Sequence, residues 1–139
     1  MIEMNLDSIE VTILRNLVFN EEFLRKVVPF MKSEYFENIN QKIIFEEVVN
    51  FVQQYNKPVT KEILCIEIEK RSDINDSVFQ EITKLISYFE DDKSEFEWLV
   101  DTTEKWCRDR AIYLALMESI QLADGKDDTK GRDAIPTIL

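Results

Sequence analysis

Apolar residues recur at three- and four-residue steps along most of this chain, which predicts helices throughout. The expected helices cover residues 8–19, 21–28, 40–55, 60–70 and 77–89. We expect N-caps at Asp7 or Ser8 and at Asn20, helices that begin at Asn40 and Thr60, and a capping box that begins at Ser77. Residues 32–36 are expected to form a further turn of helix or a loop, and they carry two aromatic side chains that suit the core. The predicted fold class is all-α.

One segment is ambiguous, because Leu64, Ile66 and Ile68 alternate with polar residues as they would in a strand. Glu and Lys fill the gaps, and a lone strand would have no partner for its hydrogen bonds. We therefore predict a helix here.

The longest predicted element runs from Ser94 to Ala123. It opens with the capping box Ser94-Glu95-Phe96-Glu97, and no Gly or Pro follows until Gly125. A heptad-like seam follows it, with Thr103 and Arg110 as polar interruptions. The apolar seam positions are Phe96, Leu99, Trp106, Tyr113, Met117 and Ile120.

The middle of this helix, residues 111–117, is apolar on every side, and a second apolar face passes through Val100, Cys107, Ala111 and Leu114. A helix packed on one small domain needs only a stripe, so we expect another molecule or a further part of the protein to cover the excess. The predicted oligomer interface is Trp106, Ala111, Tyr113, Leu114, Leu116, Met117 and Ile120. The alternative is a core-facing helix of a monomeric bundle.

The expected organisation is a compact bundle of about five or six helices over residues 1–93, the long helix over 94–123 and a mobile polar loop over 124–133. Asp133 would cap a helix over residues 134–139, but six residues are too few for a stable helix. We therefore expect that the chain was cut from a longer protein.

The net charge of the chain indicates which classes of macromolecule it can bind. The net charge is −11 over 139 residues and the pI is about 4.5, which argues against strong nucleic-acid binding. Acidic residues gather where the long helix starts, where they favour its positive end. The alternative is a docking patch for a basic partner protein. This acidic run is Glu90, Asp91, Asp92, Glu95 and Glu97.

Residue types that carry chemistry are scarce. The chain has no histidine, which removes the usual general base and imidazole metal ligands, and its two glycines cannot build a phosphate-binding loop. A helix-turn-helix over residues 60–89 would offer only Lys84 to DNA bases. Cys65 and Cys107 are expected to be packing residues. We expect no catalytic, cofactor or metal site here, no membrane span and a cytoplasmic location.

The order of these segments resembles the N-terminal domains of DnaB-type hexameric replicative DNA helicases, especially those of T-even-like phages. The resemblance spans essentially the whole chain and is carried by packing residues, so its specificity lies in their order and spacing. The matching stretches are residues 13–20 with Phe23, 33–37, Ile43-Ile44-Phe45, Lys57-Pro58-Val59-Thr60, Trp98-Leu99-Val100, Thr103-Glu104-Lys105, Arg110-Ala111 and residues 134–139.

This resemblance implies a noncatalytic assembly domain that forms a collar through a helical hairpin, of which the long helix is the first arm. Ile135, Ile138 and Leu139 would begin the linker helix that docks on a neighbouring motor. It implies homo-oligomers, contacts with primase and helicase loader, and ATP and Mg²⁺ bound by a motor domain absent from this chain. The location would be the cytoplasm of the infected bacterium. The short polar hairpin loop departs from the family pattern.

A different class of protein also fits, namely a self-contained acidic regulator that binds a basic polymerase or transcription component. The next hundred or so codons would separate the two, because a Walker-type loop after a strand supports the helicase.

Overall fold

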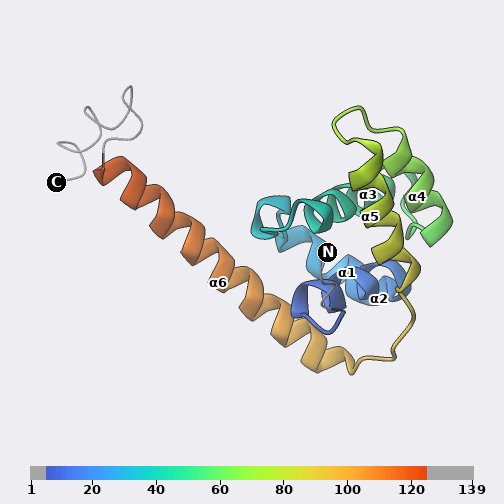
Figure 1. Cartoon of the computed structure of the whole chain (residues 1–139). Helices are drawn as coiled ribbons and strands as arrows, with labels where there is room; N and C mark the ends of the chain where they lie inside the picture. Colours follow the sequence, from blue (N-terminus) through green and yellow to red (C-terminus); the bar gives the residue numbers. More distant parts are fainter. Residues whose placement is uncertain (1–5, 125–139) are drawn as a thin grey trace. The chain divides into compact units, whose positions relative to one another are not determined.

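The computed structural model describes residues 6–124, and all regular structure within them is helical (Figure 1). The predicted all-α fold is therefore confirmed. In chain order the elements are α1 (Ile9–Phe19), α2 (Glu21–Val27), the 3-10 turns η1 (Val28–Phe30) and η2 (Ser33–Tyr35), α3 (Ile39–Tyr55), α4 (Lys61–Glu69), α5 (Asp76–Ser87) and α6 (Phe96–Ala123).

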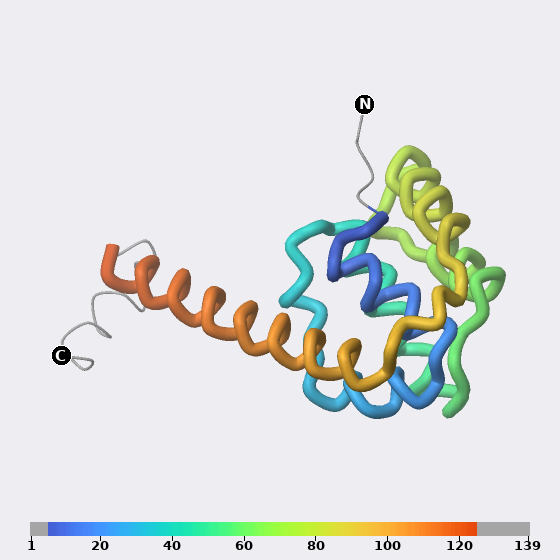
Figure 2. The backbone as a smooth tube through the Cα atoms, turned by 90° about the horizontal axis from the view of Figure 1, so that it is seen from below, coloured from blue at the N-terminus to red at the C-terminus, as the bar shows by residue number. Residues whose placement is uncertain are grey.

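The chain forms two compact units, residues 1–104 and residues 105–139. Helix α6 is continuous from Phe96 to Ala123, as its unbroken coil in Figure 2 shows, and it contributes to both units. The predicted long helix is thus confirmed, starting two residues later than expected.

In the first unit, α1 packs on α2 and α3, while α3 also packs on α4, α5 and η2. The core lies among these elements and includes three buried positions from the start of α6. The largest side chains with almost no exposure are Phe23, Phe89, Ile13, Leu14, Leu17, Leu24, Ile44, Leu64, Ile68, Ile82, Ile86 and Leu99. Tyr35 and Phe36 are buried as predicted, and Phe36 lies 5.3 Å from Phe45 between ring centroids.

Two predicted N-caps are confirmed, and Thr60 caps the helix expected to begin there. Ser8 Oγ accepts a hydrogen bond from the Val11 N–H, Asn20 Oδ1 from the Phe23 N–H and Thr60 Oγ1 from the Ile63 N–H. These bonds satisfy amides that have no partner within the first helical turn.

The two predicted capping boxes are wrong by one or two residues. Helix α5 is capped by Asn75 instead of Ser77, and α3, expected to begin at Asn40, begins at Ile39 with Asn38 as its cap. At α6 the carboxylate of Glu95, one residue after Ser94, accepts from the N–H groups of Glu97 and Trp98. At α5 and α6 the side chain that meets the free amides, the Asn75 amide oxygen or the Glu95 carboxylate, replaces the serine hydroxyl that the sequence suggested.

The strand-like segment is a helix, as predicted, and burial shows why. Leu64 and Ile68 are fully buried, whereas Ile66 is 54% exposed. Residues four apart share a helix face and residues two apart do not, so the alternation did not reflect a sheet surface.

Arginine and lysine side chains join helices of the first unit. Arg71 donates to Asp73, to Glu47 at 2.7 Å and to Glu46 at 3.1 Å, which ties the residues after α4 to α3. Lys61 Nζ donates to the carbonyls of Ser87 and Phe89, connecting the start of α4 to the end of α5. These contacts hold the two ends of α4 against α3 and α5.

Candidate interaction surface

The second half of α6 carries a continuous apolar surface. Five large side chains there are exposed, from 37% for Met117 to 58% for Leu116. Isolated exposed apolar residues are common, but a contiguous patch of them is typical of an interaction site. We call this surface the α6 stripe, and it consists of Ile112, Tyr113, Leu116, Met117 and Ile120.

The spacing of these residues explains why they form one stripe. Ile112, Leu116 and Ile120 form one row at four-residue steps, and Tyr113 and Met117 form an adjacent row. At 3.6 residues per turn the two rows occupy less than half of the helix circumference. The α6 stripe is therefore a single face that can be covered by one partner helix or helix pair.

Polar contacts border the stripe. The Arg110 guanidinium carbon lies 4.9 Å from the centroid of the Tyr113 ring, a cation–π arrangement that orients the ring on the helix surface. One turn earlier, Lys105 Nζ pairs with Asp109 at 2.7 Å. An apolar centre with charged groups at its border is the usual anatomy of a protein interface.

Toward its N-terminal end the same helix is covered. Leu99 and Thr103 are fully buried, and the Thr103 hydroxyl donates to the Leu99 carbonyl at 2.7 Å. Burying Thr103 in the seam therefore carries little free-energy cost, because its only polar side-chain atom forms a hydrogen bond within the helix. The heptad-like seam is buried near the start of α6 and exposed from Tyr113 onward.

The seven predicted interface residues divide by exposure. Trp106 is buried and Leu114 is half-buried, while Ala111 is exposed together with Tyr113, Leu116, Met117 and Ile120. Ile112, which is 56% exposed, was missing from the predicted set. Its position four residues before Leu116 is the signal that identifies it. Whether these residues meet another chain stays a prediction.

The predicted linker-helix positions Ile135, Ile138 and Leu139 lie outside the described residues, as does the expected polar loop after Asp124.

Three members of the acidic run form local contacts. Asp91 accepts a backbone hydrogen bond from Lys93, Asp92 accepts from the Ser94 N–H and hydroxyl, and Glu95 caps α6. Lys93 itself has φ of 56°, so the Asp91 contact supports a strained backbone position. Glu90 and Glu97 are exposed. The run therefore helps to start α6, and docking of a basic partner stays a prediction.

The Asp92 carboxylate is the most engaged member of the run. Partial burial disfavours its charge, but hydrogen bonds from Ser94 and Arg15 outweigh that effect and lower the pKa of Asp92 below its usual value. This carboxylate therefore stays ionised in the folded protein and serves as a fixed structural acceptor.

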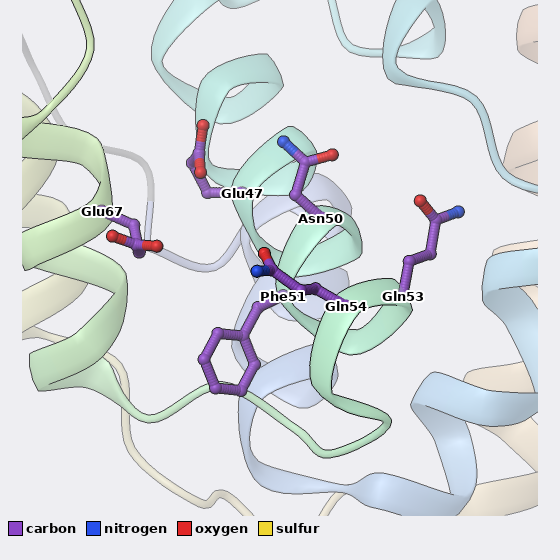
Figure 3. A pocket seen from close by; sticks show the side chains of 6 residues that line it. All are labelled: Glu47, Asn50, Phe51, Gln53, Gln54 and Glu67. Atoms are coloured by element: carbon purple, nitrogen blue, oxygen red, sulfur yellow. The ribbon is translucent and has the colours of Figure 1, made fainter.

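A pocket lies between α3 and α4, lined by Glu47, Asn50, Phe51, Gln53, Gln54 and Glu67 (Figure 3). Its two carboxylates already have cationic neighbours, since Glu47 pairs with Arg71 and Glu67 with Lys70, both at 2.7 Å. The groups that could attract a ligand are thus largely neutralised from within the chain.

Residues 6–124 contain no cluster of three or more metal-binding side chains. Cys107 is buried as expected, whereas Cys65 is only half-buried, and desolvation is the main cause that raises the pKa of its thiol. A raised thiol pKa opposes thiolate formation and suits packing better than nucleophilic attack. None of the described helices is both long enough and apolar enough to cross a bilayer.

Comparison with known proteins supplies independent evidence. No known family profile matches the chain. The chain is 31% identical over 110 residues to a DnaB-like replicative helicase of Enterobacteria phage T4. The matched region covers 79% of this chain and 23% of the phage protein, so the chain spans about a quarter of its relative's length. The chain is thus related to the DnaB-like replicative helicases, as the resemblance in its packing residues predicts.

Proposed function

We propose that this chain is the noncatalytic N-terminal assembly and partner-docking domain of a replicative DNA helicase, and that the α6 stripe is its self-association surface. The observation that carries the proposal is the row of Ile112, Leu116 and Ile120, each more than half exposed, on a helix whose earlier turns are buried. The relationship to a replicative helicase gives such a surface a role in building a multi-subunit enzyme.

The energetics favour association. Fully burying one large aliphatic or aromatic side chain contributes about 1.5 to 3 kcal/mol, and the stripe offers five. Association also costs translational and rotational freedom, so area alone does not set the affinity. Because the five side chains are 37% to 58% exposed, each gains only part of that free energy, and in this proposal the gain exceeds the cost in a homodimer and supplies one contact of a larger ring.

The parent protein would unwind duplex DNA at the replication fork with ATP and Mg²⁺ bound by its motor. In this proposal the present chain supplies no catalytic step. Its contribution is to hold subunits together and to present surfaces to primase and to a helicase loader. The strongly acidic first unit suits protein partners better than it suits DNA.

Sedimentation velocity over a concentration series tests self-association, with wild type compared to Leu116→Asp. Burying an unpaired carboxylate at the centre of the stripe should weaken association at least tenfold. The matched control is Ala115→Asp, which adds the same charge to the same part of α6 at an exposed position that belongs to neither row. Loss of association in both variants, or in neither, would contradict the assignment of the stripe.

A further inference from the structure

The excess negative charge of the chain is confined to one of its two units. Residues 1–104 carry 22 acidic and 11 basic side chains, whereas residues 105–139 carry six of each. The net charge of −11 therefore belongs entirely to the first unit. The unit that carries the α6 stripe is neutral.

The ion pairs of the first unit do not change its net charge, because the count of basic side chains above already includes every cation in these pairs. Arg71 alone is shared among Glu46, Glu47 and Asp73. Several carboxylates are exposed and form no ion pair with a cation in the described part of the chain. Four examples on different elements are Glu34, Glu69, Glu90 and Glu104.

We propose that the acidic first unit opposes the self-association that the α6 stripe drives, so that ionic strength controls the assembly of this protein. The inference rests on the proposed function. Burial of apolar surface depends little on moderate salt, whereas repulsion between like-charged bodies is screened by it. The two opposing contributions therefore respond differently to the same change in the solution.

The relevant lengths favour such control. A unit of this size has a radius of gyration of about 13 Å, so two of them in one assembly have centres some tens of Å apart. The Debye length is about 30 Å at 0.01 M salt and about 8 Å at 0.15 M. Repulsion between two such units is therefore felt at low salt and largely screened near physiological salt.

The sign of the effect discriminates between mechanisms. If charged groups at the end of the stripe, such as Arg108 and Asp109, attracted each other across the interface, added salt would weaken association. If the acidic first unit dominates, added salt strengthens it.

The test is the dissociation constant of self-association, measured by sedimentation at about 20 mM and about 300 mM NaCl. We expect wild type to associate about tenfold more tightly at the higher salt. A variant with Glu34, Glu69, Glu90 and Glu104 all changed to Gln lowers the charge from −11 to about −7. Because repulsion scales with the product of the two charges, it should fall to less than half. This variant should associate more tightly at low salt and respond less to added salt.

The matched control changes the same four residues to Asp, which keeps the charge and should behave as wild type. Association that is unaffected or weakened by salt would overturn the inference while leaving the proposed function intact. Equal salt responses in the Gln variant and wild type would also overturn it, because the salt would then act through the apolar surface. Absence of association at every salt concentration would contradict the proposed function itself.

Discussion

Arg15 and Asp92 are 77 residues apart in sequence, and the Arg15 Nε donates to the Asp92 Oδ2 at 2.7 Å. The contact ties α1 to the loop that leads into α6. Both side chains are mostly covered, at 19% and 27% exposure, so the pair is better shielded than a surface ion pair. Asp92 also accepts two hydrogen bonds from Ser94, so one carboxylate connects α1 to the residues just before α6.

Asp92→Asn should lower the free energy of unfolding by about 1 to 2 kcal/mol near neutral pH, since it weakens several charge-assisted hydrogen bonds. The pKa of Asp92 is lowered in the folded state, so its stabilising effect is complete above the unfolded pKa of about 3.8 and is lost as pH falls through the lower folded pKa. Urea denaturation should show a constant difference from wild type above about pH 5 that shrinks below about pH 4. The control is Asp91→Asn, whose ion pair with Lys93 is more exposed.

Arg71 offers a second stability test, because it serves three carboxylates with a side chain that is only 17% exposed. Hydrogen bonds to Asp73, and then to Glu47 and Glu46, raise the already high pKa of Arg71, so it is charged at any working pH. Arg71→Met should cost about 2 to 3 kcal/mol of unfolding free energy, since it leaves partly covered acids unpaired. Lys70→Met removes a pair whose lysine is 69% exposed and should cost much less, because water screens an exposed ion pair. Equal losses in thermal denaturation would contradict this account.

At the start of α6, two substitutions distinguish the N-cap seen in the structure, Glu95, from the one predicted from the sequence, Ser94. Glu95→Ala should lower stability by about 1 kcal/mol, because two backbone amides lose their acceptor. Ser94→Ala removes only an exposed hydroxyl that donates to Asp92, and its effect should be smaller. Chemical denaturation of both variants measures their free energies of unfolding. A larger loss for Ser94→Ala than for Glu95→Ala would show that Ser94 is the N-cap, as the capping box predicted.

The helices were predictable because burial follows helical spacing in this chain. Leu64 and Ile68 are buried and Ile66 is exposed, as a helix requires, even though the local alternation looked like a strand. Caps were less predictable, since Asn38, Asn75 and Glu95 compete with nearby residues that also have suitable side chains. Sequence spacing cannot rank such neighbours, because the choice depends on the path by which the chain enters the helix.

The candidate surface was predictable in position but not in extent. Apolar residues on every side of the 111–117 segment indicated excess surface, and the structure leaves most of them exposed. The burial of Trp106 and the half-burial of Leu114 could not be predicted, because spacing shows which residues share a face and not where along the helix cover ends. The two contacts that join Arg71, after α4, to Glu46 and Glu47 of α3 left no sequence signal, because the partners are 25 and 24 residues apart along the chain.

Two leucines on α6 separate folding from assembly. Leu99 is fully buried and Leu116 is 58% exposed. Leu99→Ala should destabilise the protein by about 2 to 5 kcal/mol at every protein concentration, because it leaves a cavity. Leu116→Ala should leave the unfolding of dilute protein within about 0.5 kcal/mol of wild type. Differential scanning calorimetry at low and high protein concentration distinguishes the two, and a large loss for Leu116→Ala in dilute protein would place that leucine in the core.

The most direct test of the α6 stripe is the rate at which iodoacetamide alkylates the thiol introduced by Ile120→Cys, measured from low to high protein concentration. Cys65→Ser in the same background removes the half-buried thiol, and Cys107 is already buried. We predict that alkylation slows as the protein associates, and that adding Leu116→Asp restores the fast rate at all concentrations. A fast, concentration-independent rate in protein that sediments as an oligomer would show that subunits meet elsewhere, and would contradict the central claim.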